Sequence, residues 1–287
     1  MMRSLWTGAS GMTAQQMQID VISNNLANVN TYGFKRERVE FSTLLYQTMT
    51  RAELDAANPP GRPVNLQVGL GVRPAATSRD FNVGSFERTD QQLDFAISGR
   101  GFFNVRLSNI DDPVEVIAFT RDGSFQAMPV AVGSAELILV NNAGMPILGV
   151  DGEPIIFEEW VVTSQLDVSG DGLIRHPDPE DANAEAVILG QIAMSQFPNT
   201  QGLEGIGGNL FLQTSASGAP MLERAAVGGP SEVTRPSQLV QGVLEMANVN
   251  VAVEMVHLIT TQRAYELNAR AISTSDQMLQ EAVNLRR

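Results

Sequence analysis

Apolar residues recur at helical spacing in one long segment at each end of the chain. In the first segment Leu5, Met12, Ile19 and Leu26 stand seven residues apart, with Ile22 between them. In the last segment the same spacing is followed by Met255, Leu258, Tyr265, Ile272 and Leu279. Such residues form a stripe along a helix, and an apolar stripe must be buried against another surface. We therefore predict a helix over about 4–27 and a second one after Asn250, each packed against the other and against neighbouring copies of the chain.

The sequence pattern in the middle of the chain predicts short β-strands. Between about 76 and 230, runs of β-branched and aromatic residues are separated by Asp122-Gly123, Asp151-Gly152 and Asp171-Gly172, which are typical of hairpin turns. The strands that we expect lie at 102–107, 114–119, 137–140, 155–157 together with 160–162, and 187–192. The Gly/Pro-rich region 218–236 then separates this part from the last helix.

The segment that follows the first helix is harder to assign. Residues 35–50 fit either a helix or an extended chain, and Pro59-Pro60 excludes a helix across that point. From Leu66 to Val72 apolar and polar residues alternate, which predicts a strand.

Together these patterns predict an α+β fold, in which a discontinuous helical domain built from the paired N- and C-terminal helices encloses an inserted β-rich domain. The expected divisions are 1–35 with 245–287 for the helical assembly domain, 36–75 for an extended linking segment, 76–230 for the β-rich outer domain and 231–244 for the return segment. We also expect the β-rich part to fold without residues 1–40 and 245–287.

Composition excludes several classes of function. The net charge of −13 argues against a nucleic-acid partner, because neutralising phosphates needs clustered cations, and Lys35 is the sole lysine. The chain has no cysteine, which excludes thiol catalysis, disulfides and Cys-based zinc sites. No apolar run reaches the length of about 18 residues that a membrane helix needs, and polar residues such as Gln15 and Asp20 interrupt any secretory signal core.

Little in the sequence indicates catalysis or a bound metal. Asp167, Ser169 and Asp171, with Gly172 and Asp178, nearly fit a calcium-binding loop, but a plain hairpin turn accounts better for the glycines and for Pro177. His176 and His257 are the only histidines, and no Gly-x-Ser-x-Gly elbow accompanies them. We therefore predict a protein that is not an enzyme, with no catalytic, cofactor-binding or metal-binding residues.

Two motifs near the ends resemble a known family. Asn24-Asn25-Leu26-Ala27-Asn28 with Gly33-Phe34-Lys35 is similar to the N-terminal signature of the flagellar rod and hook axial proteins. Gln262-Arg263-Ala264-Tyr265-Glu266 with Ser275-Asp276-Gln277-Met278-Leu279 resembles the C-terminal signature of the same family. Within that family the chain is most similar to distal rod proteins, and a proximal rod subunit or the hook protein are the alternatives.

The resemblance implies a structural role in the bacterial flagellum. Such proteins leave the cytoplasm through the flagellar export apparatus without a cleaved signal peptide and polymerise helically in the periplasm, where the rod transmits motor torque to the hook. The implied partners are copies of the same chain, proximal rod proteins, the hook protein and the rings around the rod, without nucleic acid or membrane insertion. The residues that we expect at subunit contacts are Leu5, Met12, Ile19, Ile22, Asn24, Asn25, Leu26, Asn28, Gly33, Phe34, Met255, Leu258, Tyr265, Ile272 and Leu279.

Overall fold

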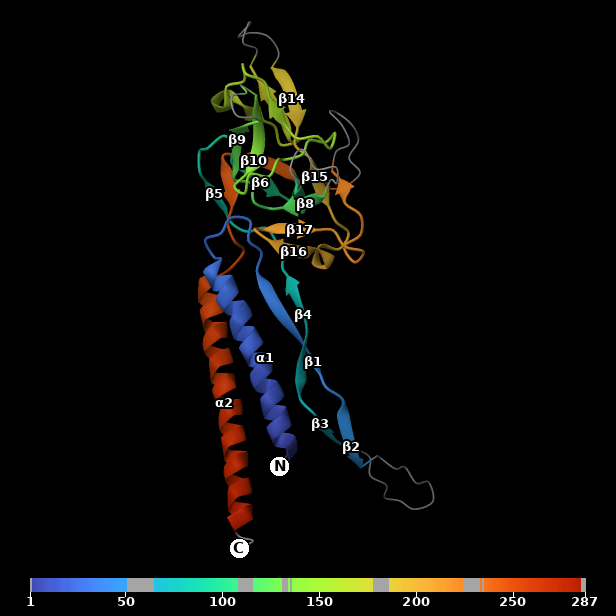
Figure 1. The fold of residues 1–287 in the computed structure, drawn as a ribbon, viewed down its shortest axis with the longest axis vertical. Helices are drawn as coiled ribbons and strands as arrows, with labels where there is room; N and C mark the ends of the chain where they lie inside the picture. The colour runs from blue at the N-terminus through green and yellow to red at the C-terminus, as the bar shows by residue number, and fades with distance from the viewer. Residues whose placement is uncertain are drawn as a thin grey trace, which may run out of the picture. The chain divides into compact units, whose positions relative to one another are not determined.

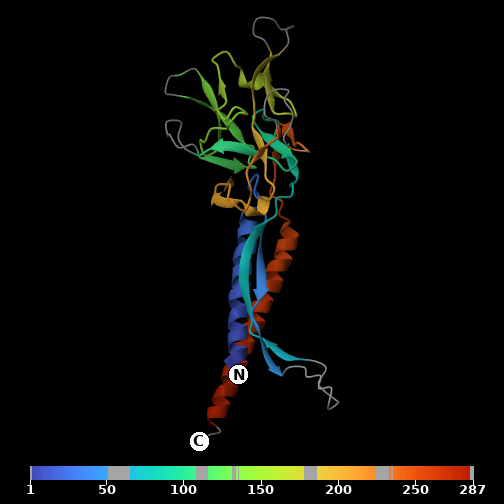
Figure 2. The same ribbon diagram turned by 90° about the vertical axis from the view of Figure 1, so that its right-hand side faces the viewer.

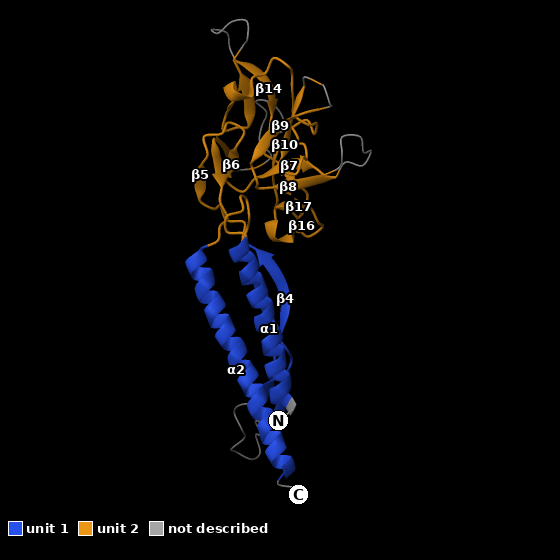
Figure 3. Cartoon of the chain, turned by 60° about the vertical axis from the view of Figure 1, so that its left-hand side comes forward, with its two compact units in different colours: residues 1–27, 37–79, 250–287 blue, residues 28–36, 80–249 orange. Residues whose placement is uncertain are grey.

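The chain folds into two compact units, each built from separate stretches of sequence (Figure 3). Unit 1 contains residues 1–27, 37–79 and 250–287, and unit 2 contains residues 28–36 and 80–249. The structure, a computed structural model, describes residues 2–50, 65–107, 116–130, 134, 136–177, 186–223, 233 and 235–284. It confirms the α+β class, with a helix at each end and strands between them.

Unit 1 is organised around the two predicted helices, α1 (Met2–Ala27) and α2 (Val251–Asn284), which pack along each other (Figure 1). The α2 helix begins where the sequence predicts it, because Asn250 caps its first turn. The Oδ1 atom of Asn250 accepts a hydrogen bond from the amide of Val253 at 3.3 Å, which satisfies a donor that the helix itself leaves free. Within the described residues, neither helix is long and apolar enough to cross a membrane.

The segment 37–79 is extended and forms two antiparallel strand pairs in unit 1. β1 (Glu37–Thr43) pairs with β4 (Val72–Arg79), and β2 (Tyr46–Thr50) pairs with β3 (Leu66–Gly69). The first pair lies along α1 (Figure 2). The ambiguity over 35–50 is thus resolved as extended chain. The strand predicted over 66–72 is confirmed in part, since its residues belong to two strands, β3 and β4, with a break at Leu70 and Gly71. Pro59-Pro60 lies outside the described residues.

Unit 2 is a set of small antiparallel sheets. The largest has the order β16 (Glu204–Gly207), β17 (Leu210–Leu212), β8 (Ile117–Thr120), β7 (Phe102–Arg106), β15 (Met194–Gln196), β18 (Met221–Leu222). Two three-stranded sheets are formed by β9 (Phe125–Pro129), β10 (Leu137–Asn141) and β11 (Ile156–Phe157), and by β12 (Asp167–Val168), β13 (Leu173–His176) and β14 (Val187–Gln191). The remaining pairs are β6 (Phe95–Ser98) with β19 (Gln238–Gln241), and β5 (Phe86–Arg88) with β20 (Val243–Glu245). Short 3-10 turns occupy Thr163–Gln165 and Thr200–Gly202.

The core of unit 2 consists of two apolar clusters. The larger one joins buried aliphatic and aromatic residues of β6, β7, β10, β13 and β19, among them Phe103 and Leu139. The smaller one is aromatic: Phe102 and Phe119 pack edge-to-face on Phe197, with ring centroids 5.8 and 4.7 Å apart. Edge-to-face pairs stabilise a core beyond the area that they bury. The buried side chains of unit 2 therefore come from segments spread over the whole middle of the chain.

The three predicted hairpin turns have different outcomes. Asp171-Gly172 turns between β12 and β13, which pair with each other, so this hairpin is confirmed. Asp151-Gly152 makes a tight turn closed by the bridge between Leu148 and Pro154. The hairpin at Asp122-Gly123 was a wrong prediction, because β8 and β9 on either side of it belong to different sheets. No strand covers 160–162, and Asp178 of the calcium-like loop lies outside the described residues.

Candidate functional site

The two helices of unit 1 lie in close contact where α1 carries Gly8 and Gly11. A Cβ atom on Gly8 would lie 2.9 Å from Cγ1 of Ile272, and one on Gly11 would lie 2.9 Å from Nδ2 of Asn268. Both distances are shorter than ordinary van der Waals contact, so the backbone of α1 packs directly on the side chains of α2. Each glycine costs about 1 kcal/mol of helix stability relative to alanine. The absence of a side chain at these two positions permits the close approach of the helices.

The α2 side of this seam is mostly polar. Glu254, Thr261 and Ser275 are the buried residues of α2, and they share a heptad face with Asn268, because positions seven apart return to the same side of a packed helix pair. The Oγ atoms of Ser275 and Ser4 are 3.4 Å apart. Among the described residues of both helices, the apolar side chains that are buried are Ala14 and Ile22. The seam therefore encloses polar side chains next to apolar residues of the predicted stripe, most of which are half-buried.

The predicted contact residues lie in several environments. In α1, Ile22 and Asn25 are buried, Asn24 is exposed, and the half-buried ones are Leu5, Met12, Ile19 and Leu26. In α2, Met255 and Tyr265 are exposed, and the half-buried ones are Leu258, Ile272 and Leu279. In unit 2, Gly33 is buried, while Asn28 and Phe34 are half-buried. The assignment of these residues to contacts between copies stays a prediction.

The α2 helix also exposes apolar side chains on the side away from the seam. Val251, Met255, Val256 and Ile259 are 38%, 50%, 60% and 53% exposed, respectively. Residues three and four positions apart lie side by side on a helix surface, and such spacings link Val251 to Met255 and both Met255 and Val256 to Ile259. These four form one patch, which we call the outer patch. Farther along the same side α2 becomes polar, with exposed Gln262, Glu266, Arg270 and Gln277.

By contrast, α1 has neighbours on two sides within unit 1. One side faces α2, and the other faces β1 and β4 (Figures 1 and 2). The Oγ atom of Ser10 accepts a hydrogen bond from the amide of Val72 at 3.4 Å, and Asn25 bonds to the backbone of Glu37. Consequently, a larger share of the residues of α2 than of α1 is exposed.

Unit 2 contains a buried ionic cluster that the sequence did not predict. Nζ of Lys35 donates to Oε1 of Glu245 at 2.5 Å and to the carbonyl oxygen of Asn82 at 2.8 Å. Arg121 donates to Oε2 of Glu245 at 3.3 Å and to the carbonyl of Gly99 at 2.8 Å. The side chains of Lys35 and Glu245 are 0% exposed and that of Arg121 is 1% exposed. We call Lys35, Arg121 and Glu245 the ionic cluster.

Burial dominates the electrostatics of this cluster. Loss of solvent lowers the pKa of Lys35; Glu245 opposes that effect and Arg121 adds to it. The pKa of Arg121 is likewise lowered by burial, against the attraction of Glu245 and Glu223. Arg121 also lies over the ring of Phe102, with Cζ 5.1 Å from the centroid. Each charge therefore depends on a partner inside unit 2, since water cannot reach it.

The one signal in the sequence that could have indicated the cluster is the rarity of lysine. Lys35 is the sole lysine of the chain and directly follows Gly33-Phe34. The backbone of Gly33 has φ of +69°, and a Cβ atom there would lie 2.6 Å from the amide nitrogen of Asp122. Glycine thus permits the close approach of two chain segments beside the cluster. Glu245 lies 210 residues away from Lys35, and no local pattern links the two.

The histidines occupy structural positions. His176 is buried: Nε2 accepts from the amide of Val162 at 3.2 Å, and Nδ1 is 2.6 Å from the carbonyl of Pro177. His257 lies on the exposed surface of α2. Within the described ranges, no group of three or more acidic or histidine side chains is placed to hold a metal ion.

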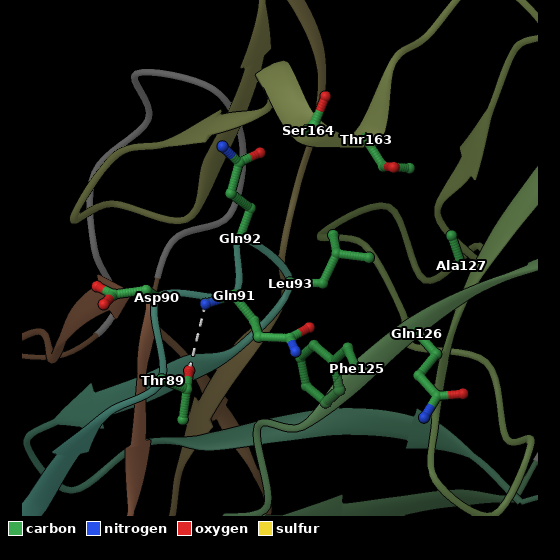
Figure 4. Close-up of a pocket in the computed structure, with 10 residues that line it drawn as sticks. All are labelled: Thr89, Asp90, Gln91, Gln92, Leu93, Phe125, Gln126, Ala127, Thr163 and Ser164. Carbon is green, nitrogen blue, oxygen red and sulfur yellow. Dashed lines mark hydrogen bonds between the residues drawn. The ribbon is translucent and has the colours of Figure 1, made fainter.

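A pocket of about 640 Å³ in unit 2 is lined by polar side chains (Figure 4). Its walls come from residues 89–93, 125–127 and 163–164. The charged residue in the lining is Asp90, and it is ion-paired with Arg88. The lining contains no histidine, cysteine or lysine that could activate one of its hydroxyl groups as a nucleophile.

Three parts of the chain match known protein families. Residues 5–35 match the family described as “Flagella basal body rod protein” and residues 96–176 match “Flagellar hook protein FlgE/F/G D1 domain”. Residues 240–285 match “Flagellar basal body rod FlgEFG protein C-terminal”. These matches include most of α1, the whole of α2 and a large part of the β-rich region between them.

Whole-length relatives agree with these matches. The flagellar basal-body rod protein FlgG of Borreliella burgdorferi is 44% identical over 287 residues, which cover 100% of both chains. FlgG of Caulobacter vibrioides is 40% identical and covers 99% of this chain and 100% of its own. FlgG of Bacillus subtilis is 33% identical, with 100% of both chains covered. Since the similarity extends from the first helix to the last, the chain belongs to the FlgG family of flagellar basal-body rod proteins.

Proposed function

We propose that this chain is a structural subunit of the distal rod, which polymerises with copies of itself into the shaft that carries motor torque to the hook. Its place would be the periplasmic part of the basal body, reached through the flagellar export apparatus. The neighbours along the shaft would be proximal rod proteins on one side and the hook protein on the other, with ring proteins around it. The proposed role is structural and requires no catalysis.

The observation that carries this proposal is the outer patch of α2. Full burial of one Val, Ile or Met side chain contributes about 1.5–3 kcal/mol. Four such side chains on one helix face therefore offer a substantial driving force for contact with another protein surface. A polymer of identical subunits would supply that surface at every position, since each copy brings its own outer patch and its own helices.

A pair of variants tests the role of the outer patch. Met255→Glu with Ile259→Glu places two charges in the patch, and Gln262→Glu with Gln277→Glu places the same charges on the polar part of the same side. Each pair is expressed in a flagellated strain whose own copy is deleted. We expect the patch variant to be exported yet to give basal bodies without hooks and cells that do not swim. The control should restore both hooks and swimming.

Two control measurements separate an assembly defect from a defect in folding or export. Circular dichroism of the purified variants must show the helix content of the wild type, so that a folding defect is recognised. Immunoblots of the periplasmic fraction must show that export is intact. Normal hook numbers in the patch variant would contradict the proposal.

A further inference from the structure

The ionic cluster lies next to the points where the chain passes between the two units. Along the sequence these points follow residues 27, 36, 79 and 249. Three of them adjoin segments that meet within unit 2: 33–36, 80–84 and 245–248. Unit 2 therefore holds, in one buried place, pieces of chain that are far apart in sequence.

A single carboxylate group joins these segments. Oε1 of Glu245 accepts from Nζ of Lys35 at 2.5 Å and from the amide of Gly84 at 2.9 Å. Nζ of Lys35 also donates to the carbonyl of Asn82, and the amide of Gly33 donates to the carbonyl of Glu245 at 2.8 Å. Segment 33–36 is thus bonded to 245–248 directly, and to 80–84 through the same side chains.

A second set of hydrogen bonds, made by Asn248 three residues after Glu245, connects the same segments. Oδ1 of Asn248 accepts from the amide of Arg36 at 2.8 Å, while its Nδ2 donates to the carbonyls of Asp80 and Asn82 at 2.7 and 3.1 Å. The same three segments are again brought together by one side chain. In both sets, hydrogen-bond donors of one segment meet acceptors of another segment.

The charges make these connections interdependent. When one member of a buried ion pair is removed, the other is left as an uncompensated charge in a place that water does not reach. Lys35 has Glu245 as its counter-charge, whereas Glu245 is shared between Lys35 and Arg121. If segment 245–248 leaves, the cations of Lys35 and Arg121 remain buried together without it, which favours the departure of segment 33–36 as well.

We infer that Lys35, Arg121 and Glu245 act as a latch that couples the docking of segment 33–36 in unit 2 to the docking of segment 245–248. Neither segment is held firmly unless the other is in place. Coupling of this kind is reciprocal, because a free energy shared by two docking events is the same whichever event comes first. The inference concerns unit 2 alone and does not depend on the proposed role in the rod.

Amide hydrogen exchange of the full chain, followed by mass spectrometry, tests the latch in both directions. In Lys35→Met the carboxylate keeps Arg121 as its partner, and the reporter is the amide of Met246, which donates to the carbonyl of Ser85. In Glu245→Gln the reporter is the amide of Arg36, which donates to Asn248. We expect the distant segment to exchange about tenfold faster or more in each variant, as the loss of a charged hydrogen bond implies.

The matched control is Arg88→Met, which removes the cation of the exposed Arg88–Asp90 pair in the same unit and should leave both segments protected. A second measurement uses the unaltered protein: in increasing urea, amides of 33–36 and 245–248 should lose protection together, with the same dependence on denaturant. If each variant exposes its own segment and leaves the distant one protected, or if the two segments open separately in urea, the latch does not exist. Should a variant fail to fold, the urea series on the unaltered protein decides.

Discussion

Asn25 and Glu37 are joined by two hydrogen bonds within unit 1. Nδ2 of Asn25 donates to the carbonyl of Glu37 at 2.8 Å, and Oδ1 accepts from the amide of Glu37 at 2.9 Å. The segment 28–36 between them belongs to unit 2, so the pair closes a loop and starts β1 beside the end of α1. Asparagine suits this position because its side chain carries both a donor and an acceptor.

Replacing Asn25 with alanine should therefore destabilise unit 1. Asn25 is 1% exposed, so the amide and carbonyl of Glu37 would lose their partner where water has little access. We expect a loss of about 1–3 kcal/mol in the free energy of unfolding, measured by urea denaturation. Gln16→Ala, at an exposed position of α1, should stay within about 0.5 kcal/mol of the wild type. An equal effect of both substitutions would contradict the structural role of Asn25.

A larger residue at position 8 should push the two helices apart. Gly8→Leu would bring side-chain atoms into the space of Ile272, and overpacking of this kind costs about 1–3 kcal/mol. Ile272→Ala in the same chain should recover part of that loss, because it removes the group that the introduced leucine meets. A double-mutant cycle in urea should give a coupling energy of about 0.5 kcal/mol or more between the two sites. Strict additivity would show that Gly8 does not face Ile272.

Asp122 should make the free energy of unfolding depend on pH. Burial raises the pKa of its carboxyl, Asp94 adds to that effect, and two hydrogen bonds from Ser124 oppose it. Because the folded pKa lies above the unfolded one, the folded state binds the proton more tightly. This contribution to stability is present below the unfolded pKa and is lost as pH rises through the folded pKa.

The variant Asp122→Asn keeps the acceptor for Ser124 and removes the charge. At pH 7 it should match or exceed the stability of the wild type, because the buried carboxylate of Asp122 is disfavoured by the loss of solvent. That advantage should shrink as the pH is lowered towards the unfolded pKa of the carboxyl. Urea titrations of both proteins at several pH values measure the difference, and an advantage that grows on acidification would refute the assignment.

The ends of unit 2 determine where a stable fragment can be cut. Removing 1–40 and 245–287, as the sequence suggested, would delete Lys35 and Glu245 and leave Arg121 buried without them. A fragment of residues 28–249 keeps the whole cluster. We expect the longer fragment to unfold cooperatively and the shorter one to be less stable by about 3 kcal/mol or more, as urea denaturation would show. Equal stabilities would mean that the cluster contributes little to unit 2.

The helices and many strands could be predicted because their patterns are local. Seven-residue spacing from Leu5 to Leu26 and alternation from Leu66 to Val72 each depend on neighbours in sequence. The hairpin expected at Asp122-Gly123 failed for the opposite reason, because β8 pairs with β7 and β17 rather than with β9. Partner choice among strands is a tertiary property that turn residues do not encode.

The candidate sites likewise combine features that follow from local sequence patterns with features that depend on tertiary contacts. The seam between the helices combines Ile272 of the predicted apolar stripe with glycines and polar residues such as Asn268, whereas Met255 of the same stripe is 50% exposed. A helical period gives the side of a helix on which residues lie, and it does not say which of two neighbours that side meets. The ionic cluster was beyond prediction, because Lys35 and Glu245 become partners only after the whole middle of the chain has folded between them.

The burial of the sole lysine should protect the side chains of the folded protein from amine-reactive reagents. An acylating dye or a biotin ester can modify a side chain of the folded molecule only at a lysine ε-amine, and that amine is enclosed by Glu245 and Asn82. Side-chain acylation, read by the mass of a single peptide, would then count the molecules that have opened. The same chemistry would leave the side chains on the surface of intact subunits unmodified while the lysines of other proteins in a mixture are labelled.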